Sequence, residues 1–517
     1  MNITKIFDRV DHYYNLNIKI IFKIAMTLEY VEKKYYKKTT RIKKLVRTIS
    51  GVTVVAIMCD PYLCPHGKCI YCPGGVKEGT PQSYVEGSPA VLRAINVAYE
   101  PYEQVKIRLL QYKKMGHDIS KIELIVMGGT FPAMPEKYQK WFIARALKAM
   151  NDYPNFEKLF SYNKLNLNKI QRKNEYAKVR CIGLTIETRP DWSKKKHIDL
   201  FLKLGATRIE LGVQSIYDDV LKIVRRGHTV SDTIEATRLL KDAGYKVCYH
   251  IMPGLPGSSI ERDYRMFKEI FNNPNFKPDM IKIYPTIIVP GTKLYEMWRK
   301  GEYKPYSLEE LIKLIAKVKT LVPRFIRIMR IQRDIPVNFI AAGLKIGNLR
   351  QKIKEYMAKR GMKCNCIRCR EIGHKLLRNE INMDKFKVKM NKFKYYASEG
   401  IEIFLTFDEM HNDLLIALLR LRIPSSKSYR PEFDSKSAII RELHVFGPVV
   451  PLGLRYQDRW QHKGFGRRLL MEAERIALEE YDIRKMFIIS GIGVREYYRK
   501  YGYRKYKKAF YMYKKLK

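Results

Sequence analysis

The stretch Cys64-Pro-His-Gly-Lys-Cys69-Ile-Tyr-Cys72-Pro-Gly-Gly75 carries three cysteines on one short loop. Three thiolates alone do not complete the tetrahedral shell of a closed structural zinc site. They suit three corners of a 4Fe–4S cluster, whose fourth iron then stays open. We therefore predict that Cys64, Cys69 and Cys72 bind a 4Fe–4S cluster, with a zinc loop as the alternative. Cys59 lies nearer a predicted strand and is left out of the ligand set.

The open iron of such a cluster can chelate the amino and carboxylate groups of S-adenosylmethionine and pass an electron to its sulfonium. The product is a 5′-deoxyadenosyl radical, which removes hydrogen from unactivated carbon. The cofactor carries this chemistry, and the protein positions it.

The sequence around this loop predicts a parallel sheet. From Val52 onward, short β-branched runs alternate with longer amphipathic stretches, which is typical of strand–helix units. Six such units are too few for a closed eight-fold barrel, so we predict an open, partial (βα)6 barrel over residues 51–325. The expected strands are Val52–Ile57, Ile122–Met127, Cys181–Ile186, Arg208–Val213, Lys246–Ile251 and Met280–Tyr284. The expected helices include Ala90–Met115, Pro135–Met150, Lys194–Leu204, Ile216–Arg225, Asp232–Ala243 and Glu261–Phe271.

Unusual residues follow the predicted strands at their C-terminal ends. Gly128-Gly129-Thr130 follows the second strand, Glu187 and Arg189 the third, and Gln214-Ser215 the fourth. In barrels of parallel strands the active site lies at this edge. We therefore predict an active site there, next to the cysteine loop.

A second cysteine group, Cys364-Asn-Cys366-Ile-Arg-Cys369, is followed by His374. Three thiolates and an imidazole form a closed tetrahedral zinc site, which stabilises a loop without an open coordination position. We predict a structural zinc in a linker over residues 326–395. Reduced cysteines without a metal are the alternative.

The pattern changes again after the linker, which predicts a separate domain over residues 396–517. The expected strands are antiparallel, and one long helix, Gly466–Tyr481, interrupts them. Gly464-Phe465-Gly466-Arg467 stands at the start of this helix, where bare backbone N–H groups and the helix dipole favour a pyrophosphate. The expected strands are Ile401–Phe407, Leu414–Leu421, Ile439–Val445 and Lys485–Ile489.

The charge of the chain favours a polyanionic partner. Lysine and arginine total 99 against 52 acidic residues, a net charge of +47. Nucleic acid fits this excess better than a membrane surface. Residues 1–50 are basic and are expected to bind RNA, with a solvated helix face as the alternative. No segment is long and apolar enough to span a bilayer and no signal peptide is evident, so we expect a cytoplasmic protein.

Several of these strings together resemble the elongator protein 3 family in its archaeal form. They are Val54–Cys59, Cys69–Gly75, Met127–Phe131, Ile186–Asp191, Gly212–Ser215, Arg226–Thr229 and Ile331–Pro336. The resemblance implies a radical S-adenosylmethionine barrel followed by a GNAT acetyltransferase domain. It also implies Tyr498 as a catalytic residue at the thioester. The acetyl-CoA contacts that it implies are Lys121, Glu442, Leu443, His444, Val445, Phe465, Gly466, Arg467 and Tyr498.

The function that the resemblance implies is a modification of transfer RNA. Acetyl-CoA and the 5′-deoxyadenosyl radical would install a carboxymethyl-type group on carbon 5 of the wobble uridine. The basic surface would hold the anticodon stem-loop through its phosphates, an electron donor is required, and a homo-oligomer is an open possibility. One alternative is a protein lysine acetyltransferase, which leaves Cys64, Cys69 and Cys72 idle. The other is a non-catalytic RNA-binding scaffold, which predicts missing motif residues.

Overall fold

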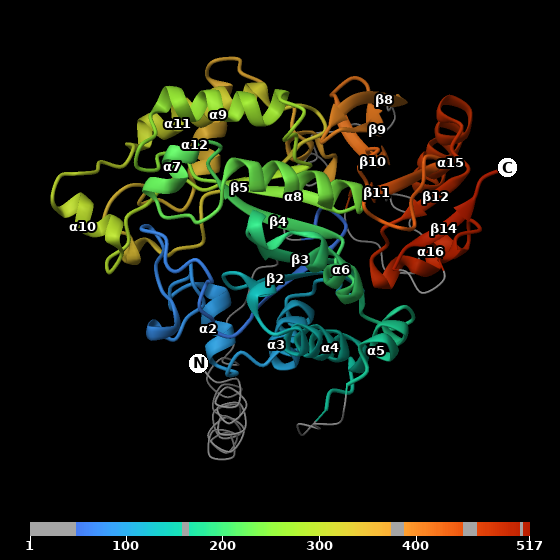
Figure 1. The fold of residues 1–517 in the computed structure, drawn as a ribbon, viewed down its shortest axis with the longest axis horizontal. Helices are drawn as coiled ribbons and strands as arrows, with labels where there is room; N and C mark the ends of the chain where they lie inside the picture. The colour runs from blue at the N-terminus through green and yellow to red at the C-terminus, as the bar shows by residue number, and fades with distance from the viewer. Residues whose placement is uncertain (1–47, 158–164, 374–386, 448–462, 507–509) are drawn as a thin grey trace.

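The computed structural model describes residues 48–157, 165–373, 387–447, 463–506 and 510–517 (Figure 1). The N-terminal segment that is predicted to bind RNA therefore lies almost entirely outside the described residues. None of the helices in these ranges has the length and apolar character needed to cross a bilayer.

The first sheet is parallel, and its strands follow one another in chain order. All six predicted strands form. A seventh strand, β7, was not predicted; it pairs with β6 and extends the sheet beyond the six predicted strand–helix units. No pairing joins β1 to β7 within the described ranges, and the barrel is accordingly open. The strands are β1 (Thr53–Met58), β2 (Lys121–Met127), β3 (Arg180–Thr188), β4 (Arg208–Gln214), β5 (Lys246–Ile251), β6 (Met280–Ile283) and β7 (Arg327–Ile331).

Helices cover the outer face of this sheet (Figure 1). They lie between successive strands, as the strand–helix pattern predicts. They are α2 (Pro89–Ile95), α3 (Pro101–Lys114), α4 (Glu136–Asp152), α5 (Leu167–Asn174), α6 (Lys195–Leu204), α7 (Asp218–Ile223), α8 (Val230–Asp242), α9 (Ile260–Asn272), α10 (Lys293–Arg299) and α11 (Leu308–Leu321). Two more follow β7, namely α12 (Leu349–Ala358) and α13 (Ile367–Arg370).

The predicted helix Ala90–Met115 is two helices in the structure, α2 and α3. Ala98 and Tyr99 between them have φ of 47° and 59°, outside the right-handed helical region. Pro101 then begins α3, a first-turn position where its missing N–H costs no hydrogen bond. The apolar periodicity continues through this turn, so the sequence pattern did not predict the break between α2 and α3.

Alternate residues of each barrel strand point to opposite faces of the sheet. On β4, Ile209 and Leu211 join the apolar core beneath the helices. Arg208 and Glu210, one position out of phase, are also fully buried but pair with charged neighbours. The barrel interior is therefore lined with charge, whereas its outer face is apolar.

The second sheet comes from the C-terminal part of the chain. Its order is β13-β14-β12-β11-β10-β9-β8, and its strands are antiparallel except for β11 and β12. That parallel pairing ends at Ile440 and Ile488, although β11 continues to Val445, so the two strands separate there. The strands are β8 (Val388–Ala397), β9 (Gly400–Glu409), β10 (Leu414–Ile423), β11 (Ser437–Val445), β12 (Lys485–Ile488), β13 (Arg504–Lys505) and β14 (Met512–Lys515).

The helices of this domain are α15 (Phe465–Arg475), which continues as a π-helical turn to Glu480, and α16 (Arg495–Arg499). One predicted boundary cuts through a strand, and the predicted linker contains another strand. β7 lies inside the predicted linker over 326–395, and β8 begins at Val388, ahead of the predicted start of the domain. Both strands contain several Lys or Arg residues, which obscured the β pattern.

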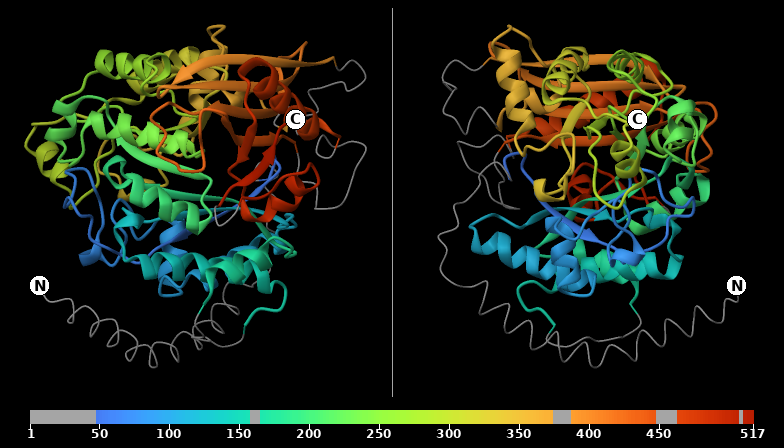
Figure 2. Two further views of the ribbon diagram at one scale, coloured as in Figure 1. Left: turned by 45° about the vertical axis from the view of Figure 1, so that its right-hand side comes forward. Right: turned by 90° about the vertical axis from the view of Figure 1, so that its left-hand side faces the viewer.

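The second domain packs against the N-terminal ends of the barrel strands. His444 lies 2.7 Å from the carbonyl oxygen of Ser50, just before β1, and Tyr511 donates to that of Ala243, before β5. A Cβ on Gly491 would lie 2.0 Å from the carbonyl oxygen of Ile182 in β3, so only glycine allows this approach. Figure 2 shows the orange and red strands of the second sheet beside the green barrel strands.

Candidate functional site

The predicted cluster loop follows β1 and lies against the C-terminal end of β2. The backbone N–H of Cys59 donates to the carbonyl oxygen of Met127, and its thiol donates to that of Gly128. Gly128 has φ +124°, and a Cβ there would lie 2.5 Å from the Cys59 sulfur. Burial raises the pKa of the Cys59 thiol far above its ordinary value, so Cys59 stays protonated.

Each predicted cluster ligand has polar neighbours at its sulfur. Cys64 lies 3.4 Å from the Thr130 hydroxyl, and Cys69 lies 3.2 Å from Nε2 of His66. Cys72 accepts a hydrogen bond of 3.1 Å from the backbone N–H of Ser83. A donor such as the Ser83 N–H stabilises thiolate sulfur when it carries the negative charge of a metal ligand.

The two cysteine groups differ in spacing. The sulfurs of Cys364, Cys366 and Cys369 all lie within 4.8 Å of one another, and within the described residues those of Cys64, Cys69 and Cys72 form no such group. A single zinc with Zn–S bonds of about 2.3 Å needs closely spaced sulfurs. The wider set fits the corners of a larger cluster, and the compact set fits a single ion.

Buried polar atoms without partners surround the cluster loop. Among the described residues they include Oγ1 of Thr188, Nη1 of Arg189 and Oε1 of Gln214. Burial, with Arg226 and Arg189 nearby, lowers the pKa of His228 to about 2, so its ring is neutral. Unpaired buried polar groups cost free energy unless a ligand completes them. These side chains therefore fit a polar ligand such as S-adenosylmethionine beside the predicted cluster.

The sequence did not predict the network of paired charged side chains inside the barrel. Glu187 on β3 accepts from Tyr84 at 2.7 Å and from Lys282 at 3.2 Å. Glu210 on β4 pairs with Lys282 and with His250, the latter at 2.8 Å. A signal was available on β4, where the charged residues Arg208 and Glu210 stand two positions apart in a strand that is otherwise largely apolar.

Glu210, Cys248 and His250 bring their ligand atoms within 4.8 Å of one another. Lys282 already pairs with the Glu210 carboxylate, and Arg208 lies 3.1 Å from its other oxygen. These cations disfavour a metal ion at this place, and the group is better described as part of the ionic lining of the barrel.

Glu442 lies on β11, buried at the domain interface. Arg420 donates to its carboxylate at 2.7 Å, and Nζ of Lys246, from β5 of the barrel, lies 3.6 Å away. Burial alone would raise the pKa of Glu442, but Lys246 and Arg420 hold it at about 2. The carboxylate is therefore charged at neutral pH.

Tyr498 of α16 is buried near Glu442, and both burial and that carboxylate raise its pKa above the ordinary value. Burial lowers the pKa of His444. Lys121 begins β2, at the barrel edge that faces the second domain, and burial lowers its pKa to about 8. Leu443 and Val445, which flank His444 at the C-terminal end of β11, are half-buried.

The start of α15 is built from glycine, as a pyrophosphate site requires. Gly464 caps the helix with φ +85°. Gly466 is buried, and a Cβ there would lie 2.7 Å from the Tyr497 hydroxyl and 3.7 Å from Val445. Phe465 packs on Phe407 with ring centroids 5.0 Å apart, whereas Arg467 is exposed. The fold thus places the end of β11 next to the N-terminus of α15.

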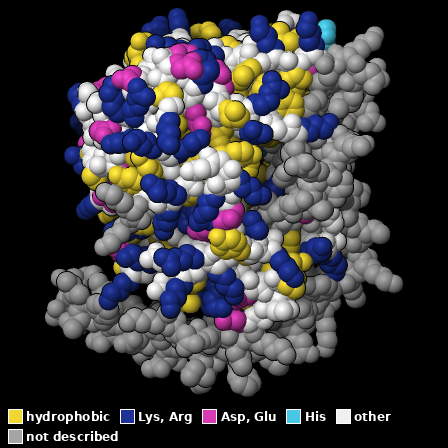
Figure 3. Space-filling view, turned by 90° about the vertical axis from the view of Figure 1, so that its right-hand side faces the viewer, with side chains coloured by type: hydrophobic (Ala, Val, Ile, Leu, Met, Phe, Trp, Pro, Cys, Tyr) yellow, Lys and Arg dark blue, Asp and Glu magenta, His cyan; other side chains and the backbone are white. Residues whose placement is uncertain are grey.

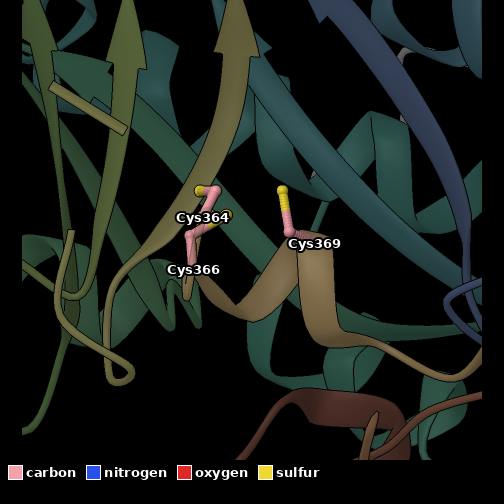
Figure 4. A group of neighbouring side chains, drawn as sticks. All are labelled: Cys364, Cys366 and Cys369. Atoms are coloured by element: carbon pink, nitrogen blue, oxygen red, sulfur yellow. The ribbon is translucent and has the colours of Figure 1, made fainter. Parts of the chain in front are cut away.

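Figure 4 shows Cys369 on α13 and Cys364 and Cys366 on the segment before it. Cys366 is fully buried, and contacts with the thiols of Cys364 and Cys369 lower its pKa well below the ordinary value. A lowered pKa favours the thiolate that a metal requires. His374, the predicted fourth ligand, lies outside the described residues.

Comparison with known families defines the class of the first domain. The Radical SAM superfamily matches residues 61–270, and the Radical_SAM C-terminal domain matches residues 278–359. The chain is thus a radical S-adenosylmethionine protein, whose open parallel barrel carries the cysteine loop after its first strand. This class implies a 4Fe–4S cluster and S-adenosylmethionine, which the loop and the unpaired polar atoms around it fit.

The relatives are similar along most of the chain. The tRNA uridine(34) acetyltransferase of Methanocaldococcus jannaschii is 53% identical over 465 residues, 89% of this chain and 84% of that protein. Elongator complex protein 3 of Saccharomyces cerevisiae is 44% identical over 481 residues, 91% of this chain and 84% of that protein. The solved structure of archaeal Methanocaldococcus infernus Elp3 with an N-terminal deletion has a TM-score of 0.77 and 49% identity, and the match covers 91% of this chain and 100% of that one. The chain belongs to the elongator protein 3 family.

Proposed function

We propose that this chain modifies transfer RNA by installing a carboxymethyl-type group on carbon 5 of the wobble uridine, with acetyl-CoA as the source of the group. One observation carries the proposal. A three-cysteine loop with unpaired polar atoms around it, and a glycine-built helix start suited to acetyl-CoA, lie at the two ends of one barrel. The printed names of the relatives, which refer to tRNA uridine(34) acetyltransfer and to elongator, support the same substrate.

Cys64, Cys69 and Cys72 are the proposed cluster ligands. When bound there, the cluster and S-adenosylmethionine supply the one-electron chemistry that removes hydrogen from an unactivated carbon. Thr188 and Gln214 offer hydrogen bonds to the bound S-adenosylmethionine, because Oγ1 of Thr188 and Oε1 of Gln214 are buried without a protein partner. The proposal also requires an external one-electron donor.

Acetyl-CoA is proposed to lie between the end of β11 and the start of α15. The bare N–H groups at Gly464 and Gly466 hold the pyrophosphate, and Arg467 adds positive charge. The separation of β11 from β12 after Ile440 leaves room for the pantetheine arm. Tyr498, buried near Glu442, is the residue proposed to meet the thioester.

The charge state of Glu442 argues against the protein lysine acetyltransferase alternative. That reaction needs a base to deprotonate the attacking amine, and an efficient base has a pKa near the working pH. Glu442 has a pKa of about 2 and is held by Arg420 and Lys246. It serves better as an anion that aligns two cations at the interface than as a proton acceptor.

The surface suits an RNA substrate. Figure 3 shows lysine and arginine side chains spread over the described part of one face of the molecule, with few acidic side chains among them. Phosphate contacts from such a surface give affinity without reading the sequence. The bases of an anticodon loop are accessible because they are single-stranded.

The test is mass spectrometry of transfer RNA after anaerobic incubation with acetyl-CoA, S-adenosylmethionine and dithionite. We expect wobble uridine to gain a carboxymethyl-type mass only when all three are present. Acetylation of protein lysines that proceeds without S-adenosylmethionine, with unmodified uridine, would overturn the proposal in favour of the lysine acetyltransferase.

A further inference from the structure

A short segment, Gln82–Tyr84, contacts two of the proposed cluster ligands. The side-chain oxygen of Gln82 accepts the backbone N–H of Cys64 at 2.8 Å. The next residue, Ser83, donates its backbone N–H to the Cys72 sulfur at 3.1 Å, and its hydroxyl lies 3.5 Å from the same sulfur. The segment therefore joins the beginning of the cysteine loop to its end.

Ser83 has an unusual backbone conformation. Its φ is +78°, a region of backbone conformation that residues other than glycine and asparagine rarely adopt. Its N–H is shared between the Cys72 sulfur and the carbonyl oxygen of Pro73 at 3.2 Å. Such a conformation persists only where surrounding contacts enforce it.

Two distant elements provide those contacts. The Tyr84 hydroxyl donates to Glu187 on β3 at 2.7 Å. On the other side, Nη2 of Arg333 donates to the carbonyl oxygen of Ser83. Arg333 belongs to the string Ile331–Pro336, for which the proposed reaction gives no role.

Arg333 is itself held in place by the end of the barrel. Gln332, the residue before it, donates its backbone N–H to the carbonyl oxygen of Ile283 in β6 at 2.8 Å and has φ +105°. The side chain of Gln332 donates to the carbonyl oxygen of Ile346. A second uncommon backbone conformation thus directs Arg333 back across the barrel mouth to Ser83.

We propose that Arg333 is a positioning residue that sets the reduction potential of the iron–sulfur cluster by holding Ser83 against Cys72. Reduction adds an electron, and therefore negative charge, to the cluster and its thiolates. Donors to a ligand sulfur stabilise that charge and raise the potential. Without Arg333, the carbonyl of Ser83 loses its anchor, the strained turn relaxes, and both donors leave the Cys72 sulfur.

The inference rests on the proposed ligand set, and the experiment separates the two. The full chain is reconstituted anaerobically, its iron is counted, and the cluster is titrated with dithionite while its EPR signal is followed. The variants are Arg333→Gln, Arg333→Lys, Ser83→Gly and the double variant Ser83→Gly with Arg333→Gln. Arg360→Gln is the matched control, since Arg360 is exposed after α12 and stacks on Tyr356.

We expect Arg333→Gln to lower the midpoint potential relative to Arg360→Gln at equal iron content. Arg333→Lys should also lower the midpoint potential. Lysine keeps the positive charge, but its side chain is too short to contact the carbonyl oxygen of Ser83. Ser83→Gly keeps the positive φ and the N–H but removes the hydroxyl, so a smaller drop is expected. The double variant should lie above Arg333→Gln alone, because glycine occupies the positive φ without strain and can keep its N–H on the sulfur without Arg333.

Several outcomes decide the matter. Equal potentials for Arg333→Gln and Arg360→Gln overturn the proposal, as does a normal potential in Arg333→Lys, which would show that charge alone acts. If Arg333→Gln folds but does not bind iron, the result supports the role of Arg333 in holding Ser83 against Cys72. The midpoint potential is then measured on Ser83→Gly instead. Absence of iron from the unaltered protein would instead overturn the ligand assignment.

Discussion

At the scale of single residues, Glu442 shows how neighbours decide a side chain's role. A glutamate near Tyr498, the tyrosine proposed to meet the thioester, invites assignment as a general base. Here Arg420 contacts it at 2.7 Å and Lys246 approaches from the other domain. Both cations favour the charged form, so the residue contributes as a fixed anion.

Glu442→Gln is expected to destabilise the protein by about 3–5 kcal/mol, because the buried Arg420 and the half-buried Lys246 each lose an ion pair at the interface. The folded-state pKa of about 2 lies below the ordinary value of about 4.3. This contribution is therefore fully present above about pH 4.3 and is lost only as the pH falls towards 2. Thermal unfolding should thus show the same deficit at pH 6 and pH 8. A deficit that changes between these values would indicate a titrating base.

Gly466→Glu is expected to abolish acetyl-CoA binding while iron content stays normal. The new side chain would place a Cβ 2.7 Å from the Tyr497 hydroxyl and a negative charge at the proposed pyrophosphate site. Calorimetric titration with acetyl-CoA measures the loss. Gly347→Ala is the control, since its Cβ would meet no atom within 4 Å. Unchanged affinity for acetyl-CoA in Gly466→Glu would show that the coenzyme does not bind at the start of α15.

At the scale of elements, the period of the hydrophobic pattern predicted the barrel strands well. β5 has the predicted ends, and the other five differ only at their termini. The pattern failed where charge interrupts it. β7 reads Arg-Ile-Met-Arg-Ile, and β8 alternates lysine with apolar residues because one face is exposed. The turn at Ala98 and Tyr99 could not be predicted either, because neither residue favours positive φ.

Cys366→Ala is expected to remove zinc and to lower the thermal midpoint without affecting the iron signal. The sulfur of Cys366 is fully buried between its two neighbours, on the segment that connects β7 to the second domain. Metal analysis by mass spectrometry and calorimetry measure both effects. Cys181→Ala, a buried cysteine in β3, should lower stability alone. Zinc retained by Cys366→Ala would contradict the ligand set.

At the scale of the whole molecule, buried ion pairs join the two domains. Arg441 of β11 contacts Asp279 beside β6 at 2.6 Å, and Arg420 lies 3.4 Å from the same carboxylate. Arg422 of β10 pairs with Asp242 at the end of α8 at 2.7 Å. The sequence alone could not predict these pairs. The two partners lie far apart in the chain, and only the fold brings them together from different domains.

Asp279→Asn is expected to destabilise the protein by about 3–5 kcal/mol and to uncouple the two domains. Arg441 of β11 and Arg420 of β10, both from the second domain, would then lose the barrel carboxylate that they share. Calorimetry should show one cooperative transition for the unaltered protein and two for the variant. A single transition at the original temperature would mean that apolar contacts alone hold the domains together.

The central claim is that the cysteine loop and the acetyl-CoA site serve one reaction on transfer RNA. The most direct test is Cys69→Ala, with uridine modification and acetyl-CoA binding measured on the same preparation. Cys69 lies at the far end of the barrel from the second domain, so its loss should leave acetyl-CoA affinity unchanged. The account predicts normal acetyl-CoA binding with no modified uridine. Acetyl transfer to RNA or protein at the normal rate in this variant would contradict it.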